Sequence, residues 1–138
     1  ELIRGIQEAY NEHGLTFDNM HTVSTSYEVS YPYFLEYFKT NRPKVVIAGY
    51  DKEGVAIINA ARANGIKIPE DCSIISIDGI QVSKYTIPTL TTLVQPSKDM
   101  GAKAVEILLD VLNGNKNSCQ LKVDTSLREG GTLAKPIT

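Results

Sequence analysis

The sequence of 138 residues has few of the side chains on which metal sites, disulfide frameworks and hydrolytic active sites depend. Its two cysteines, Cys72 and Cys119, lie far apart and fit no metal-ligand spacing. Its two histidines, His13 and His21, stand in predicted loops and not at strand ends, and there is no nucleophile elbow, phosphate-binding loop or zinc motif. We therefore expect a protein that is not an enzyme, needs no cofactor and works in a reducing, cytoplasmic compartment.

Excess charge and long apolar runs are missing too. The net charge of −2 and the isoelectric point near 5.7 argue against a nucleic-acid-binding surface in this stretch, because phosphates are bound by a basic face. No run approaches the ~18 apolar residues that a membrane span requires, so no membrane partner is expected. With 42% hydrophobic and 22% charged residues, the composition is that of an ordinary globular domain with its own core.

What the sequence does contain is a regular alternation of helical and strand patterns. Three of the predicted helices stop at a glycine, which accepts the left-handed conformation that closes a helix. Short apolar strands between helices are typical of an α/β fold with a mostly parallel sheet flanked by helices. Helices are predicted over 1–13, 30–40, 52–64 and 97–113, and strands over 20–25, 44–49, 73–77, 91–95, 119–124 and 126–133.

The predicted helix 52–64 is apolar over more of its circumference than packing on a sheet requires. Lys52, Asn59 and Arg62 form a narrow polar stripe, and apolar residues cover most of the rest. The excess predicts either a second subunit against this helix or a helix sandwiched inside one domain, and the pattern does not decide between them. Helix 97–113 shows a similar excess.

Three predicted strands lead into side chains that suit a polyhydroxylated ligand, Tyr50, Asp78 and Gln95. Ligands of open parallel sheets bind beyond the carboxyl ends of the strands. An acid accepts hydrogen bonds from hydroxyls, an amide donates and accepts, and a tyrosine ring covers an apolar sugar face. Tyr27, in the predicted loop before helix 30–40, is a further candidate wall. The hypothesis requires neighbouring strands, so that Tyr50 and Asp78 open into a common groove.

Each of these side chains also has a purely structural interpretation. Tyr50 could lie in the core or an interface, and Tyr27 could simply be packed. Asp78 could close a turn or cap a helix, and Gln95 could satisfy backbone groups. Asp51 directly precedes a predicted helix and is interpreted as its N-cap residue, not as a ligand contact.

Three runs of sequence add more specific information when they are taken together. Residues 48–51 are Ala-Gly-Tyr-Asp, and residues 68–78 are Ile-Pro-Glu-Asp-Cys-Ser-Ile-Ile-Ser-Ile-Asp. Residues 88–96 are Pro-Thr-Leu-Thr-Thr-Leu-Val-Gln-Pro, with Met100-Gly101 beyond. Their order and spacing resemble the Ala-Gly-Asn-Asp, Val-Pro-Glu-Asp-Ile-Ser-Val-Val-Gly-Phe-Asp and Pro-x-Leu-Thr-Thr-x-x-Gln-Pro…Gly segments of the LacI/GalR (lactose-repressor-like) family of transcription regulators.

The resemblance implies a periplasmic-binding-protein-like (type I) sensor of two α/β lobes that closes on a small effector, often a sugar or a nucleobase. It also implies a homodimer whose N-terminal helix-turn-helix, absent from this chain, binds operator DNA. By analogy, residues 1–90 form most of the second lobe, residues 91–113 return to an otherwise absent first lobe, and residues 114–138 cross back. Residue 1 already sits in a helical pattern, so we expect the natural chain to begin earlier.

The resemblance also implies roles for individual positions. Asp78 matches the acid that binds effector hydroxyls, Tyr50 stands where an asparagine usually contacts the ligand, and Gln95 matches a polar residue near the hinge. Helix 52–64 and segment 80–87 match the dimer surface. The residues predicted at that surface are Val55, Ile58, Arg62 and Tyr85.

Several alternatives stay open at this point. Tyr50 in place of asparagine, and Leu2 in place of a frequent arginine, leave the effector open between a sugar, a nucleobase and a corepressor protein. A solute-binding protein of a sugar transporter would share the fold. An enzyme on a similar sheet would need an acid-base pair that the sequence does not display, and a plain interaction module would bind no small ligand.

Overall fold

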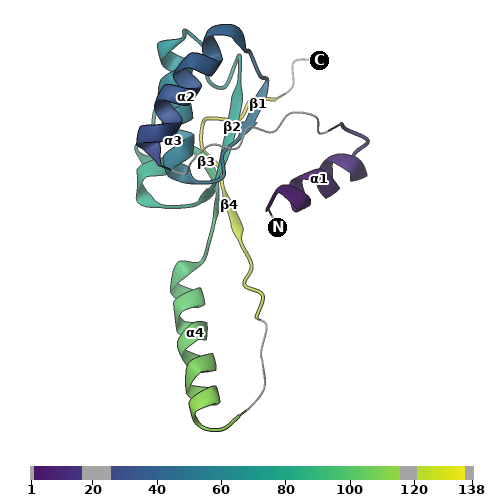
Figure 1. Cartoon of the computed structure of the whole chain (residues 1–138), viewed down its shortest axis with the longest axis vertical. Coiled ribbons are helices and arrows are strands. Elements are labelled where there is room, and N and C mark those ends of the chain that lie inside the picture. The colour runs from purple at the N-terminus through teal and green to yellow at the C-terminus, as the bar shows by residue number, and fades with distance from the viewer. Residues whose placement is uncertain (1, 17–25, 116–120, 136–138) are drawn as a thin grey trace.

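The computed structural model describes residues 2–16, 26–115 and 121–135, and within them the chain forms four α-helices, one 3-10 helix and four strands. The helices are α1 (Leu2–Glu12), α2 (Tyr27–Thr40), α3 (Asp51–Ala63), η1 (Gln81–Lys84) and α4 (Ser97–Leu112), and the strands are β1 (Val45–Ile47), β2 (Ser73–Asp78), β3 (Thr91–Val94) and β4 (Ser126–Arg128). Figure 1 shows α2 and α3 side by side against the sheet, and α4 extending away from it below β3 and β4.

The four strands form one sheet in the order β1-β2-β3-β4. The first three are parallel to one another, and β4 pairs antiparallel with β3. In the register, Val46 lies beside Ile74, Ser76 beside Thr92, and Thr92 beside Arg128. The predicted α/β fold with a mostly parallel sheet is confirmed, and so is the adjacency of the two central strands. Parallel pairing brings the carboxyl ends of β1, β2 and β3 to one edge of the sheet.

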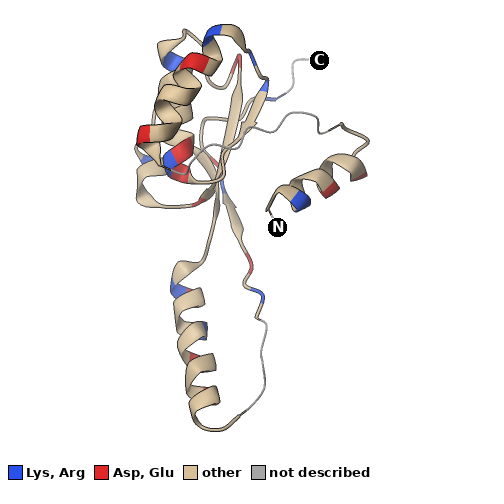
Figure 2. Ribbon diagram, in the orientation of Figure 1, with Lys and Arg blue, Asp and Glu red and all other residues tan. Residues whose placement is uncertain are grey.

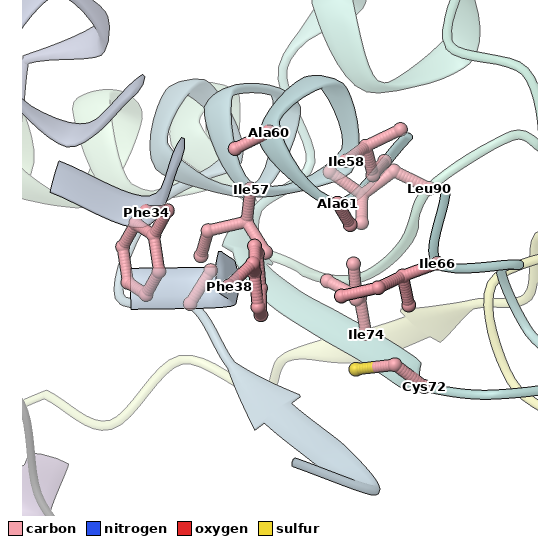
Figure 3. Packing of buried hydrophobic residues seen from close by; sticks show 11 residues of the cluster. Phe34, Phe38, Ile57, Ile58, Ala60, Ala61, Ile66, Cys72, Ile74 and Leu90 are labelled. Carbon is pink, nitrogen blue, oxygen red and sulfur yellow. The ribbon is translucent and has the colours of Figure 1, made fainter. Parts of the chain in front are cut away.

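The core lies between one face of this sheet and the helices α2 and α3, as Figure 3 shows. Phe34 and Phe38 of α2 pack with their ring centroids 5.8 Å apart and lie close to Ile57 of α3. Each large side chain removed completely from water stabilises the fold by roughly 1.5–3 kcal/mol. The buried cluster comprises Phe34, Phe38, Ala48, Ile57, Ile58, Ala60, Ala61, Ile66, Cys72, Ile74 and Leu90.

The apolar excess of α3 is used mostly inside the chain. This helix packs against α2 as well as against β2 and η1, so the interpretation of a helix sandwiched within one domain accounts for most of its buried surface. Ile58 is only 2% exposed and belongs to the core. Its predicted place at a dimer surface is therefore wrong, because its side chain is already covered by its own chain.

Two helix starts differ from the predictions, for identifiable local reasons. Helix α2 begins three residues earlier than predicted, because the Ser26 side chain accepts a hydrogen bond from the Val29 backbone amide (3.3 Å) and caps the helix. Tyr27 is therefore the first residue of α2 and not part of a loop. Helix α3 begins at Asp51, so its N-cap position belongs to Tyr50 and the interpretation of Asp51 as the cap is wrong.

The C-terminal strand is shorter than predicted. Only Ser126–Arg128 pairs with β3, whereas a strand was predicted over 126–133. A strand was also predicted over 119–124, but residues 121–124, the described part of that range, form no strand. The strand predicted over 20–25, together with His21 and Cys119, lies outside the described residues.

Charged residues of both signs are interspersed over α2 and α3 (Figure 2). Ion pairs such as Lys39 with Glu36, at 2.6 Å, join exposed neighbours on one helix, and such pairs contribute only ~0–1 kcal/mol. Among the described helices, none combines the length and the apolar character needed to cross a bilayer.

Helix α4 contains no buried residue, although one of its sides is strongly apolar. Leu108 is 55% and Leu112 is 72% exposed. Each Å² of apolar surface removed from water contributes roughly 25 cal/mol. A second molecule that covers this helix would therefore form a stabilised complex. We therefore expect the isolated chain to self-associate, with a mass above 15.2 kDa by size-exclusion chromatography with light scattering.

A double variant, Leu108→Glu with Leu112→Glu, should shift this equilibrium towards the monomer, because the two side chains lie one turn apart on the same side of α4. A matched double variant, Glu8→Gln with Glu12→Gln on α1, should leave the mass unchanged. A wild-type chain that stays monomeric at all concentrations would count against the prediction.

Candidate functional site

The three candidate ligand-binding side chains lie at the carboxyl edge of the sheet. Asp78 is the last residue of β2, Tyr50 follows β1 after a short connection, and Gln95 directly follows β3. Tyr50 is 46% exposed, whereas Asp78 and Gln95 are half-buried. The strands that lead to these residues are neighbours, as the sequence hypothesis requires, and a common groove between Tyr50 and Asp78 stays a prediction.

Asp78 and Gln95 are in direct contact. The Gln95 side-chain amide donates to Asp78 Oδ1 (3.2 Å), and the Gln95 backbone amide donates to the Asp78 carbonyl (3.1 Å). The carboxylate also accepts a backbone hydrogen bond from Asp51, at the start of α3. Gln95 and the Asp51 backbone thus orient the carboxylate, and because an ionised carboxylate has about four acceptor positions, it can still accept from a donor such as a hydroxyl.

The electrostatic environment of Asp78 favours the protonated form. Partial burial raises the pKa of its carboxyl above the ordinary value, the negative charge of Asp51 raises it further, and a backbone hydrogen bond from Asp51 offsets part of this rise. The charged form of Asp78 therefore has a free-energy penalty in this site. A ligand that donates hydrogen bonds to the carboxylate would offset that penalty.

The backbone at this point is unusual as well. Asp78 has φ of 123°, a conformation that residues other than glycine rarely adopt, and Gly79 follows with φ of 77°. A Cβ on Gly79 would stand 2.8 Å from Val94 Cα and from both Val94 methyl carbons. Such conformations persist only where the surroundings enforce them, and they gather at functional sites.

Asp51 is the buried centre of this edge of the sheet. Its carboxylate is 0% exposed and accepts three hydrogen bonds: Oδ1 from the hydroxyls of Ser76 and Thr92, both at 2.6 Å, and Oδ2 from the Ile80 backbone amide at 2.7 Å. It therefore joins α3 to β2, to β3 and to the turn after β2. The start of α3 is held instead by Glu53, which accepts from the Gly49 backbone amide (2.8 Å).

Sequence reasoning missed this role of Asp51, although a signal for it was present. Ser76 and Thr92 are polar residues inside apolar strands, and buried hydroxyls need partners. The register places them side by side, so one acceptor can serve both. Arg128, which contacts the same turn from β4, was not singled out at all.

Tyr27 contacts α3 and not the strand ends named above. Asn59 donates to its hydroxyl oxygen (3.1 Å), and its ring stacks on Tyr31 with centroids 5.7 Å apart. These contacts support the packed interpretation of Tyr27, and its role as a wall of the site stays a prediction.

The residues predicted at a dimer surface, apart from Ile58, retain exposed or partly exposed positions. Val55 is half-buried, Tyr85 is 78% exposed, and Arg62 donates to the Ile87 carbonyl. A surface hollow of about 400 Å³ lies beside Arg62 and is bounded in part by Arg62 and Ile87. It lies at the C-terminal end of α3, at the opposite end of that helix from Tyr50, and so is separate from the candidate ligand site.

The remaining reactive side chain in the core is inert. Cys72 is 1% exposed, and burial raises the pKa of its thiol to about 11, so at neutral pH it is a protonated core side chain. Within the described part of the chain, no three His, Cys, Asp or Glu residues come together in a way that could hold a metal ion.

Comparison with known proteins adds independent information. The chain matches the family described as the periplasmic binding protein-like domain over residues 1–133. It is 32% identical over 115 residues to the HTH-type transcriptional repressor PurR of Aliivibrio fischeri, an alignment that covers 80% of this chain and 34% of that repressor. The chain thus spans about a third of the length of this curated relative.

Two solved structures share the fold. A transcriptional regulator, CelR, in complex with cellobiose superimposes with a TM-score of 0.87 at 24% identity, over 94% of this chain and 41% of that one. The lac repressor dimer bound to operator and the anti-inducer ONPF superimposes with a TM-score of 0.89 at 18% identity, over 96% of this chain and 47% of that one. The resemblance to LacI-type regulators that the sequence motifs indicate is confirmed by these relatives.

Proposed function

The chain belongs to the periplasmic binding protein-like domain family, and from this premise we propose that it is the effector-sensing and dimerisation part of a LacI-type, DNA-binding transcription regulator. The effector is a small polar molecule such as a sugar or a nucleobase. The regulators among its relatives favour this function over that of a solute-binding protein of a transporter. Such a regulator works in the bacterial cytoplasm, and this part of it carries out no reaction.

The observation that carries the proposal is the oriented carboxylate of Asp78. Gln95 orients it at the carboxyl edge of the sheet, and a carboxylate oxygen has acceptor positions beyond those that its protein partners use. A hydroxyl or ring N–H of the effector would donate to that oxygen, and the ring of Tyr50 would cover an apolar face of the same molecule. A charge-assisted hydrogen bond of this kind contributes roughly 1.5–3 kcal/mol.

The path of the chain supports a two-lobed sensor. β3 leads out of the sheet into α4, and β4 returns beside it, so these two strands join α4 to the rest of the fold (Figure 1). In the proposed regulator, residues 1–90 form most of the second lobe, residues 91–113 extend into the first lobe, and residues 114–138 cross back. Effector binding would shift the two lobes from an open to a closed arrangement, and the DNA-binding headpieces would follow.

Dimerisation is proposed to use the surface that carries Val55, Arg62 and Tyr85. The 78% exposure of Tyr85 is high for an aromatic side chain, and aromatic and arginine side chains are typical anchors of interfaces. Operator DNA would be bound only through the N-terminal headpiece of the regulator. A corepressor protein in place of the small molecule is the second candidate, which the replacement of asparagine by Tyr50 keeps open.

Isothermal titration calorimetry of the intact regulator tests the function. The panel consists of glucose, cellobiose, lactose, adenine, guanine and hypoxanthine, and at least one compound is expected to bind. The variant Asp78→Asn should weaken that binding by about tenfold or more, because an amide replaces the charged acceptor. Asparagine tolerates positive φ better than alanine does, so the backbone at this position is preserved.

The matched control is Asp71→Asn, which removes an exposed carboxylate near the amino end of β2, at the opposite end of that strand from Asp78. This variant should bind as wild type does. Binding should also weaken on acidification, and from a higher pH than for an ordinary aspartate, because the pKa of Asp78 is raised. If Asp78→Asn binds the same compound as tightly as wild type, the site assignment fails.

A further inference from the structure

The turn that follows Asp78 consists of Gly79 and Ile80. The backbone N–H and C=O groups of both residues are hydrogen-bonded. The Gly79 amide donates to Thr92 Oγ1 (3.3 Å), and the Ile80 amide donates to Asp51 Oδ2 (2.7 Å). The Gly79 carbonyl accepts from Arg128 Nη1 (3.1 Å), and the Ile80 carbonyl accepts from Arg128 Nη2 (3.5 Å).

The two charged side chains reach this turn from different elements. Asp51 comes from the start of α3 and is fully buried, whereas Arg128 is the last residue of β4 and is half-buried. Asp51 accepts from the amide side of the turn and Arg128 donates to its carbonyl side, so the turn lies between a negative and a positive group. We call these two side chains with Thr92 the turn clamp.

The position of Arg128 at this turn costs folding stability. Its Nη2 also donates to the Ser83 hydroxyl, yet its Nε is buried without a partner among the described residues. None of the acceptors that the described residues provide to its guanidinium is a carboxylate. A buried donor without a partner costs stability, so its presence calls for an explanation beyond stability.

The conformation of Asp78 supplies that explanation. Asp78 directly precedes the clamped turn and adopts φ of 123°, which an unconstrained chain would relax. With both peptide groups of the turn held, that rotation is blocked, and the carboxylate stays against Gln95.

We propose that Arg128 and Asp51 are positioning residues of the effector site, which act through the Gly79–Ile80 turn to hold the carboxylate of Asp78 in its ligand-binding orientation. The proposal rests on the proposed function in that it takes Asp78 as the effector acid. It assigns to β4, the strand that returns from α4, a direct part in forming the site.

The first test compares Arg128→Met with Arg128→Lys in the intact regulator, by calorimetry with whichever panel compound binds the wild type. Methionine keeps much of the side-chain length but donates no hydrogen bond, and affinity should fall at least about tenfold. Lysine keeps the charge and donates from a single nitrogen, so it should recover part of the loss. The control is Arg42→Met. Arg42 also donates to backbone carbonyls, but it precedes the amino end of β1, so this variant should bind as wild type does.

Calorimetry also separates positioning from mere stabilisation. A positioning role raises the dissociation constant while the number of sites per chain stays at the wild-type value. A purely structural role lowers the number of competent sites and leaves the dissociation constant of the folded fraction unchanged, and that result would overturn the proposal.

Amide hydrogen exchange of the intact regulator judges the clamp without any effector. In Arg128→Met, amide exchange at Gly79 and Ile80 should be faster than in wild type. Exchange at Ile74, in the strand β2 that leads into this turn, should be unchanged. Unchanged exchange at the turn would overturn the proposal even if no panel compound binds. A wild-type regulator that binds nothing while the turn loosens in the variant would contradict the proposed function and leave the clamp supported.

Discussion

Replacing Asp51 by alanine is expected to lower the free energy of unfolding by about 3–5 kcal/mol. The substitution leaves the hydroxyls of Ser76 and Thr92, both on fully buried residues, and the partly buried amide of Ile80 without their common acceptor. Each buried donor left without a partner costs roughly 1–3 kcal/mol, and the three losses overlap because they share one site. Equilibrium unfolding of the chain in urea measures the effect.

The matched control is Asp71→Ala. Asp71 also accepts a hydrogen bond from a backbone amide, that of Lys67 at 2.8 Å, but it is exposed, so water can replace it. A loss of about 0.5–1 kcal/mol is expected there. Equal losses in the two variants would show that the buried carboxylate does not join the strands in the way described.

The second large effect is expected for Gly79→Ala, which should cost about 2–5 kcal/mol. An alanine at φ of 77° adopts a left-handed conformation at a cost of roughly 1–2 kcal/mol. Its Cβ would also meet the backbone and both methyl groups of Val94 at 2.8 Å, a contact that requires β3 to move. The same movement would disturb Asp78, so effector binding by the intact regulator should weaken as well.

Gly65→Ala separates the two contributions, because Gly65 has φ of 71° but nothing within 4 Å of the position of a Cβ. This variant should show only the conformational cost of roughly 1–2 kcal/mol. The difference between the two variants in urea unfolding then measures the contact with Val94. If both variants lose the same free energy, the close approach of the turn to β3 is relieved without cost and the prediction is wrong.

The alternation of helices and strands was accessible from the sequence because it depends on local pattern. Apolar runs such as 73–77 stand between turn residues, and glycines such as Gly65 and Gly114 close the preceding helices. The exact starts of α2 and α3 were less accessible. They depend on whether Ser26 and Glu53 form capping hydrogen bonds, which several residue types at several positions could have done.

The candidate site was predicted in part for the same kind of reason. Asp78 and Gln95 could be named because each directly follows an apolar strand, and parallel strands bring such residues to one edge. Their hydrogen bond to each other, the left-handed conformation of Asp78 and the burial of Asp51 could not be named, because all three depend on the register between strands that are distant in the sequence.

Composition and local periodicity therefore predicted the class of fold, most of its elements and the strand ends proposed here as the ligand site, since each of these depends on residues within one turn or one strand. The packing of distant segments alone decided that α3 is buried on two sides, that Asp51 serves three donors and that Arg128 reaches the turn beside Asp78. The local sequence around an aspartate at the start of a helix is the same whether its carboxylate caps that helix or, as for Asp51, binds two strands. Only the positions of Ser76 and Thr92 in space distinguish the two outcomes.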